Sequence, residues 1–371
     1  MARAQALPSE ASNEPVKLAD IGAWKTALLS GRPVLSHLNA DTTWLVQLPR
    51  SPTGPEAAPG GRSHFNILID PWLDGPQSDV ASWFSTQWHV EPPFVRTIKE
   101  LSDVLAQLEG DHDIMRPPSP AAVRERGALI DAAVVSHEFT DHCHRKTLEE
   151  LPKSTPAFAT DKAARLISTW KHFSCVVAIP GFSGTEPDWA EVLRDKTGSL
   201  PPWLGIGRVV SQGNALYYHS AVAIVFELPS ASHGESRDAE AIIYSPHGIK
   251  ATDLADFRGC LGNGIETLAL LHGLDDVRIW MTSQLNLGAL NGIEAARACG
   301  AKYWVATHDE AKRGAGFISW LLRRRSYTLH DAVETERAKT RAVPASLEKP
   351  ASPDFAFVSL GSGDALVLLA G

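Results

Sequence analysis

Histidine and aspartate side chains gather in one short segment of the sequence. His137, Asp141, His142 and His144 lie close together, directly after the apolar run Ala132 to Val135. Such an apolar run is typical of a buried strand. A hydrolytic metal site needs three or four nitrogen or oxygen ligands and an open position for water. The segment therefore predicts metal ligands in the loop that leaves this strand.

Other histidines follow other predicted strands. His219 opens an apolar run that reaches Leu228, His247 follows the predicted strand 241–244, and His308 follows the predicted strand 303–306. One histidine-rich loop would be a weak indication, whereas separate loops that each leave a strand favour a shared site. The candidate ligands at these strand ends are His137, Asp141, His142, His144, His219, His247, His308 and Asp309.

The elements that must position these residues form a mixed α/β pattern. Strands are predicted over 43–48, 65–70 and 176–179, a strand pair over 215–228 and closing strands over 355–369. Helices are predicted over 95–108, 161–172 and 292–299, and Arg323 to Arg325, which follow the apolar stretch 317–322, resemble the last turn of a helix. We expect a disordered tail over 1–16 and one domain over 17–371, with an insertion around 76–128 that forms one wall of a pocket.

Composition excludes several classes of protein. Of the 371 residues, 44% are hydrophobic and 21% are charged, which is ordinary for a globular protein rather than a disordered one. The net charge of -8 offers no basic surface for nucleic acid. No apolar stretch approaches the ~20 residues of a membrane span, so a soluble, cytoplasmic protein with no membrane partner is expected. The four cysteines lack CxxC spacing and are expected to be free thiols. The oligomeric state stays open.

The loop from Ser136 to His142 reads Ser-His-Glu-Phe-Thr-Asp-His, which resembles the His-x-His-x-Asp-His signature of the metallo-β-lactamase superfamily. Two further stretches, 67–71 and 305–309, resemble the early strand that ends in aspartate and the strand that carries the last metal histidine. The resemblance runs from Trp44 to the end of the chain. It implies an α/β (α+β) fold, a four-layered αββα sandwich, with a metal site at one edge between the two sheets.

The chain departs from the superfamily pattern at two positions. Phe139 stands where the second histidine is expected, and His247 stands where a metal-bridging aspartate is expected. Carried over residue by residue, one metal site keeps only His137 and His219. The other keeps Asp141, His142 and His308 and gains His247. We therefore expect one tightly held ion, zinc first, with a second ion weak or absent; iron and manganese also suit nitrogen and oxygen ligands.

The resemblance implies a metal-dependent hydrolase acting on an ester, lactone, thioester or amide carbonyl of a small molecule through metal-bound hydroxide. Asp141 and His142 are the predicted catalytic residues, with Asp141 orienting the attacking water. Two alternatives are a non-catalytic binding module of the same fold and an iron-dependent redox enzyme. Nuclease activity is disfavoured by the acidic charge.

Two assignments stay open at this point. Asp70 either orients a metal-bound histidine or only ends its strand. Trp44, Trp72, Trp83 and Trp88 either line an apolar pocket or belong to the core.

Overall fold

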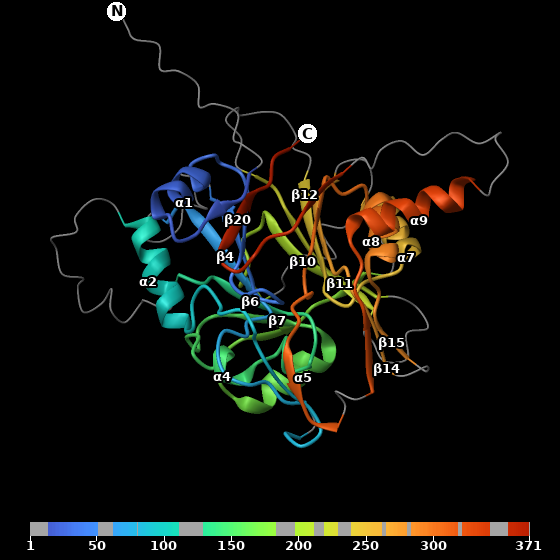
Figure 1. The fold of residues 1–371 in the computed structure, drawn as a ribbon. Coiled ribbons are helices and arrows are strands. Elements are labelled where there is room, and N and C mark those ends of the chain that lie inside the picture. The colour runs from blue at the N-terminus through green and yellow to red at the C-terminus, as the bar shows by residue number, and fades with distance from the viewer. Residues whose placement is uncertain are drawn as a thin grey trace, which may run out of the picture.

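The computed structural model describes residues 14–50, 62–79, 81–110, 129–182, 197–210, 219–228, 239–261, 265–279, 283–317, 321–341 and 355–370. Two large sheets face each other, and helices cover their outer faces (Figure 1). No helix among these residues is long and apolar enough to cross a membrane. The predicted tail over 1–16 lies outside the description as far as residue 13, and its last residue belongs to the first strand, β1 (Val16–Lys17).

The first sheet has eight strands in the order β1-β20-β2-β3-β4-β6-β7-β8. Neighbours are antiparallel from β1 to β4 and parallel from β4 to β8. Its strands after β1 are β2 (Val34–His37), β3 (Trp44–Pro49), β4 (His64–Ile69), β6 (Ala132–Val135), β7 (Ala157–Ala159), β8 (Val176–Ala178) and β20 (Asp364–Val367). The predicted strands at 43–48, 65–70 and 176–179 are confirmed.

The second sheet has seven strands in the order β19-β16-β13-β12-β11-β10-β9. Strands β12, β13 and β16 run parallel, so their carboxyl ends share one edge of the sheet. The strands are β9 (Gly181–Phe182), β10 (Leu204–Val210), β11 (Ser220–Phe226), β12 (Ala239–Ser245), β13 (Ile265–His272), β16 (Tyr303–Val305) and β19 (Ala356–Val358). Of the strand pair predicted over 215–228, the structure describes β11, which pairs with β10.

Apolar side chains divide the protein into four layers. Val46, Ile67, Ile224 and Ile242 are fully buried between the two sheets. The outer face of the first sheet packs against α1 (Ile21–Leu28), α2 (Ile98–Glu109), α4 (Arg145–Leu148) and α5 (Asp161–Trp170). The outer face of the second sheet packs against α7 (Ala251–Leu261), α8 (Ala289–Cys299) and α9 (Leu329–Arg341). Helix, sheet, sheet and helix thus follow in the predicted αββα order (Figure 1).

Two small sheets complete the described chain. One is a ribbon of β5 (Thr86–Trp88) and β17 (Arg313–Ala315), and the other has the order β15-β14-β18. Its strands are β14 (Asp276–Ile279), β15 (Ser283–Asn286) and β18 (Leu322–Arg325). Strand β5 and helix α2 belong to the predicted insertion around 76–128, of which residues 111–128 lie outside the description.

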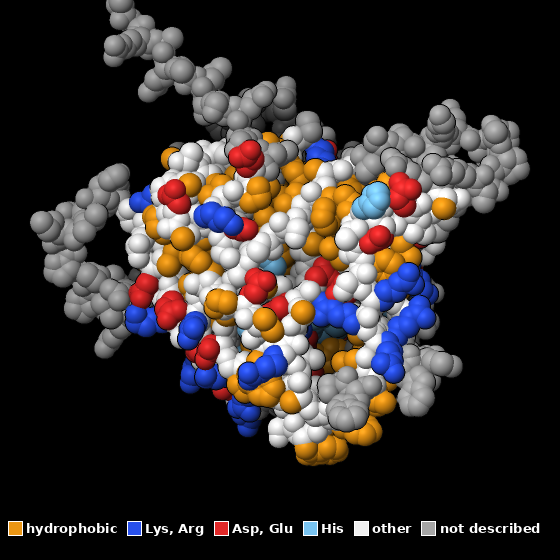
Figure 2. Space-filling model, viewed as in Figure 1, with side chains coloured by type: hydrophobic (Ala, Val, Ile, Leu, Met, Phe, Trp, Pro, Cys, Tyr) orange, Lys and Arg blue, Asp and Glu red, His pale blue; other side chains and the backbone are white. Residues whose placement is uncertain are grey.

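The arginines at 323–325 form a strand, so the predicted last turn of a helix is wrong there. Pairing of β18 with β14 overrides the local pattern, and Arg324 reaches inward to Asp275. Arg323 lies opposite Arg278 in this pair, and both are exposed. Basic side chains accordingly gather at the right of Figure 2, a local cluster that the acidic net charge does not suggest.

Cysteines play no crosslinking role among the described side chains. Cys143, Cys175 and Cys299 are free, as expected, and the first and last are buried.

Candidate metal centre

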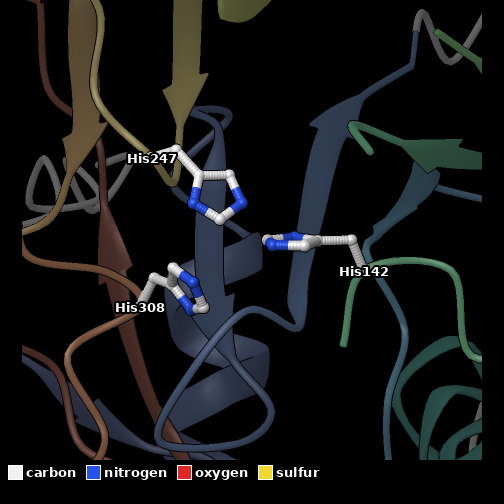
Figure 3. A group of neighbouring side chains, drawn as sticks. All are labelled: His142, His247 and His308. Carbon is white, nitrogen blue, oxygen red and sulfur yellow. The ribbon is translucent and has the colours of Figure 1, made fainter. Parts of the chain in front are cut away.

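Three histidines from three different loops meet between the sheets. His142 follows β6, His247 follows β12 and His308 follows β16. The carboxyl ends of these strands lie at one edge of the sandwich, where loops commonly carry ligand-binding residues. One nitrogen from each imidazole lies within 4.8 Å of the other two, and all three residues are buried. Figure 3 shows the three rings turned toward one another.

Each of the three imidazoles is anchored through its Nδ1 atom. The Nδ1 of His142 lies 2.7 Å from Asp70 Oδ2, that of His247 lies 2.9 Å from Asn286 Oδ1, and that of His308 lies 2.9 Å from Asp41 Oδ1. These oxygens only accept hydrogen bonds, so each Nδ1 must donate. The proton on Nδ1 leaves the lone pair on Nε2, which is the arrangement of metal-binding histidines.

The His142 Nε2 atom tests whether the site fits a metal ion. It is fully buried and makes no hydrogen bond to any described residue. A buried acceptor without a partner costs free energy, and a bound cation would supply the missing interaction. Three imidazole donors suit zinc, and also iron and manganese to a lesser extent. The residues present therefore fit the expected metal.

Asp141 lies beside the triad, which is the group of His142, His247 and His308. Its Oδ1 atom is 3.7 Å from His142 Nε2, and its Oδ2 atom is 3.9 Å from His308 Nε2. Asp141 also belongs to a second metal-like grouping with Asp41 and His308. Lys312 reaches into that grouping, with its Nζ atom 2.9 Å from Asp141 Oδ2 and 2.6 Å from Asp41 Oδ2. The ammonium group thus bridges the two carboxylates.

Burial and neighbouring charges shift the pKa values of the histidines and of Asp141 in different directions. Burial lowers the pKa of His247 well below its ordinary value, and it also lowers the pKa of His308. Burial would also lower the pKa of His142, but Asp141 and Asp70 outweigh it and raise that pKa. Burial would raise the pKa of Asp141, yet Lys312 and His142 hold it well below its usual range. An ionised carboxylate therefore stands beside imidazoles of which two favour the neutral, metal-binding form.

The remaining predicted ligands are placed at different distances from this centre. His137 is buried, and the centroid of its ring lies 4.6 Å from that of His247 and 5.4 Å from that of His142. It therefore borders the site, although it is in neither metal-like grouping of the described residues. His219 is half-buried and is likewise in neither grouping; its Nδ1 atom lies 3.2 Å from the carbonyl oxygen of His247.

Phe139 and His144 lie at the edge of the site. The centroid of the Phe139 ring is 5.9 Å from that of His137 and 6.2 Å from that of His247, so a phenyl group without a lone pair borders these two histidines. His144 turns away, with Nδ1 2.8 Å from the Thr147 hydroxyl. It does not replace the ligand missing at position 139.

The structure bears on both assignments that the sequence left open. Asp70 accepts hydrogen bonds from His142 and from the backbone and hydroxyl of Ser136, so it orients a histidine of the triad. Its φ of 42° and the φ of 59° at His308 are strained for non-glycine residues, as is common at functional sites. Trp44 and Trp72 are fully buried, Trp88 is half-buried and Trp83 is 72% exposed.

Three residues of the site went unnoticed in the sequence. Asp41, Asn286 and Lys312 come from the β2–β3 loop, the end of β15 and the loop after His308. Of these three, only Lys312 could have been suspected from the sequence, because it lies four residues after the predicted ligand His308.

Comparison with known proteins bears on the fold. No protein-family model and no curated protein sequence matches the chain. Among solved structures, isothiocyanate hydrolase from Delia radicum gut bacteria matches with a TM-score of 0.50 and 13% identity over 91% of this chain and 100% of that one. The chain has the metallo-β-lactamase fold. At this identity the likeness extends to the fold alone.

Two further solved structures are similar at lower scores. A possible metal-dependent hydrolase from Veillonella parvula has a TM-score of 0.46 and 14% identity, over 91% of this chain and 100% of that one. The metallo-β-lactamase fold protein YhfI from Bacillus subtilis has a TM-score of 0.42 and 13% identity, over 90% and 98% of the two chains.

Proposed function

We propose that this protein is a metal-dependent hydrolase that cleaves an ester, lactone, thioester or amide bond of a small molecule. One observation carries the proposal. Three buried imidazoles converge, and each is anchored at Nδ1 by an acceptor side chain, namely Asp70, Asn286 or Asp41. This pattern orients three Nε2 lone pairs toward one point, which neutral core histidines have no reason to do.

We propose His142, His247 and His308 as the ligands of a single zinc ion. Zinc bound there would polarise the scissile carbonyl and make a water molecule more acidic. Asp141 would orient the attacking water and carry its proton to the leaving group. Its carboxylate is held ionised by Lys312, in the form that accepts a hydrogen bond from water, and it lies within 4 Å of two imidazole Nε2 atoms.

His137 and His219 have a weaker claim as ligands. They would be the remaining donors of a second ion, but Phe139 stands beside His137 and offers no lone pair. We therefore assign His137 to the wall of the site and propose one ion rather than two.

The alternatives are separated by particular residues. A non-catalytic binding module would have no need for the anchoring contacts of Asp70, Asn286 and Asp41, which keep the triad in its metal-binding tautomer. An iron-dependent redox enzyme remains a second candidate, because three imidazoles and one carboxylate also suit iron. The metal found in the purified protein separates these two enzymes.

The test is a hydrolysis screen over lactones, thioesters, esters and lactams with the zinc-loaded protein. Asp141→Ala should lower the rate on any hydrolysed substrate by about 100-fold or more, because it removes the proposed general base. Asp74→Ala is the matched control, since Asp74 is a half-exposed carboxylate that pairs only loosely with Lys146, at 3.8 Å. Equal rates for parent and Asp141→Ala would rule out the proposed role of Asp141.

A further inference from the structure

A lysine is placed where a cation would otherwise bind. Two metal-like groupings overlap in this site, one of three histidines and one of Asp41, Asp141 and His308, and they share His308. Lys312 lies 2.6 Å from Asp41 Oδ2 and 2.9 Å from Asp141 Oδ2. Its ammonium group thus occupies the grouping of Asp41, Asp141 and His308.

The lysine is held firmly in this position. Its side chain is only 11% exposed, and its Nζ atom lies 5.4 Å from the centroid of the Trp72 ring. The loop that carries it is fixed at Asp309 and Glu310. The Asp309 carboxylate accepts hydrogen bonds from the backbone of Leu274 and Asp275, and Glu310 binds His89. Lys312 therefore acts as a built-in part of the site rather than a surface side chain.

Its effect on metal binding follows from ligand chemistry. Carboxylate oxygens suit hard ions such as manganese and magnesium, whereas imidazole nitrogens suit zinc. With the Oδ2 atoms of Asp41 and Asp141 bound to an ammonium group, an incoming ion meets one positive charge and two engaged carboxylates. On the other side, the three imidazoles offer the ion nitrogen atoms as ligands. The lysine thus lowers the affinity of the site for hard ions that prefer oxygen ligands.

We propose that Lys312 determines metal selectivity, by filling the Asp41 and Asp141 grouping as an internal cation and directing the metal to His142, His247 and His308. The inference rests on the proposed function only in taking the triad as the metal site. It explains why the site would prefer zinc to manganese, and it does not depend on which bond is hydrolysed.

The experiment compares zinc and manganese affinities of the parent and Lys312→Met. Zinc binding is measured by competition with a chromophoric chelator, and manganese binding by loss of the electron paramagnetic resonance signal of the free ion. Removing the ammonium frees both carboxylates, so manganese affinity should rise at least tenfold more than zinc affinity. Lys312→Gln, which keeps an N–H donor without the charge, should change the ratio in the same direction and serves if the methionine variant does not fold.

Lys146→Met is the matched control, because the Lys146 side chain is 68% exposed and, among the described residues, forms an ion pair with Asp74 outside the site. It should leave both affinities unchanged. A ratio of affinities equal to that of the parent in folded Lys312→Met or Lys312→Gln overturns the inference and leaves the triad intact. A parent that binds no zinc overturns the proposed function, and a variant that nevertheless gains manganese would still support the role of Lys312.

Discussion

Asp70→Asn should weaken zinc binding without touching a proposed ligand. Asp70 is fully buried at the end of β4, and its Oδ2 atom lies 2.7 Å from Nδ1 of His142. The same carboxylate accepts from the backbone N–H of Ser136 at 2.7 Å. Asparagine has one acceptor oxygen where aspartate has two, so the substitution sets an N–H group against one of these donors.

The magnitude follows from the role of the contact. Replacing the partner that orients a metal-bound histidine lowers metal affinity by about 10- to 100-fold. That range corresponds to about 1.4 to 2.7 kcal/mol of binding free energy. The loss should lie near the upper end, because His142 is fully buried and the described residues offer its Nδ1 atom no better acceptor.

Zinc affinity is measured by competition with a chromophoric chelator, with circular dichroism as a check on folding. Asp74→Asn is the matched control, since Asp74 is half-exposed and follows the same strand. It should bind zinc as the parent does. If folded Asp70→Asn binds zinc within twofold of the parent, the orienting role of Asp70 is refuted, and with it the argument from anchored tautomers.

Two further predictions concern stability. Burial lowers the pKa of His64 to about 4, so between pH 6.5 and 4 the unfolded chain takes up a proton that the folded residue does not. As the pH is lowered through this range, the free energy of unfolding should decrease by up to about 3 kcal/mol more in the parent than in His64→Gln. Equal decreases for the two proteins in denaturant titrations would contradict this. Gly292→Ala should lower the free energy of unfolding by about 1–3 kcal/mol, because a Cβ atom there would lie 2.5 Å from Trp304 Cζ2. Gly181→Ala, whose methyl group meets nothing within 4 Å, is its control, and equal melting temperatures for the two variants would contradict the packing argument.

Local sequence patterns were sufficient where a strand leads directly into a ligand. The apolar run 132–135 forms β6, and His142 follows it into the site, because a strand that is buried on both faces shows itself as a continuous apolar run. The same reasoning located His247 and His308 after β12 and β16. The pattern of strands and helices predicted mixed α/β content, whereas the four-layered sandwich was implied by the resemblance to the metallo-β-lactamase superfamily.

Contacts between distant segments were not predictable in the same way. His308 and Asp41 are 267 positions apart in the sequence, and His247 and Asn286 are 39 apart, so no spacing rule connects them. His219 was predicted as a ligand from its place beside a strand and from the family resemblance, and neither of these fixes the direction of its side chain. The arginines at 323–325 were assigned to a helix because their pairing partner, β14, lies far away in the sequence.

The most direct test of the account is the metal content of the protein purified without chelator, determined by elemental mass spectrometry. We predict about one equivalent of zinc in the parent and none in the His142→Ala, His308→Ala double variant, because two of three ligands are lost. The double variant His172→Ala, His330→Ala, which changes two histidines outside the site, should retain the metal. No metal in the parent after reconstitution with zinc, or the same metal content in both double variants, would contradict the assignment of the triad.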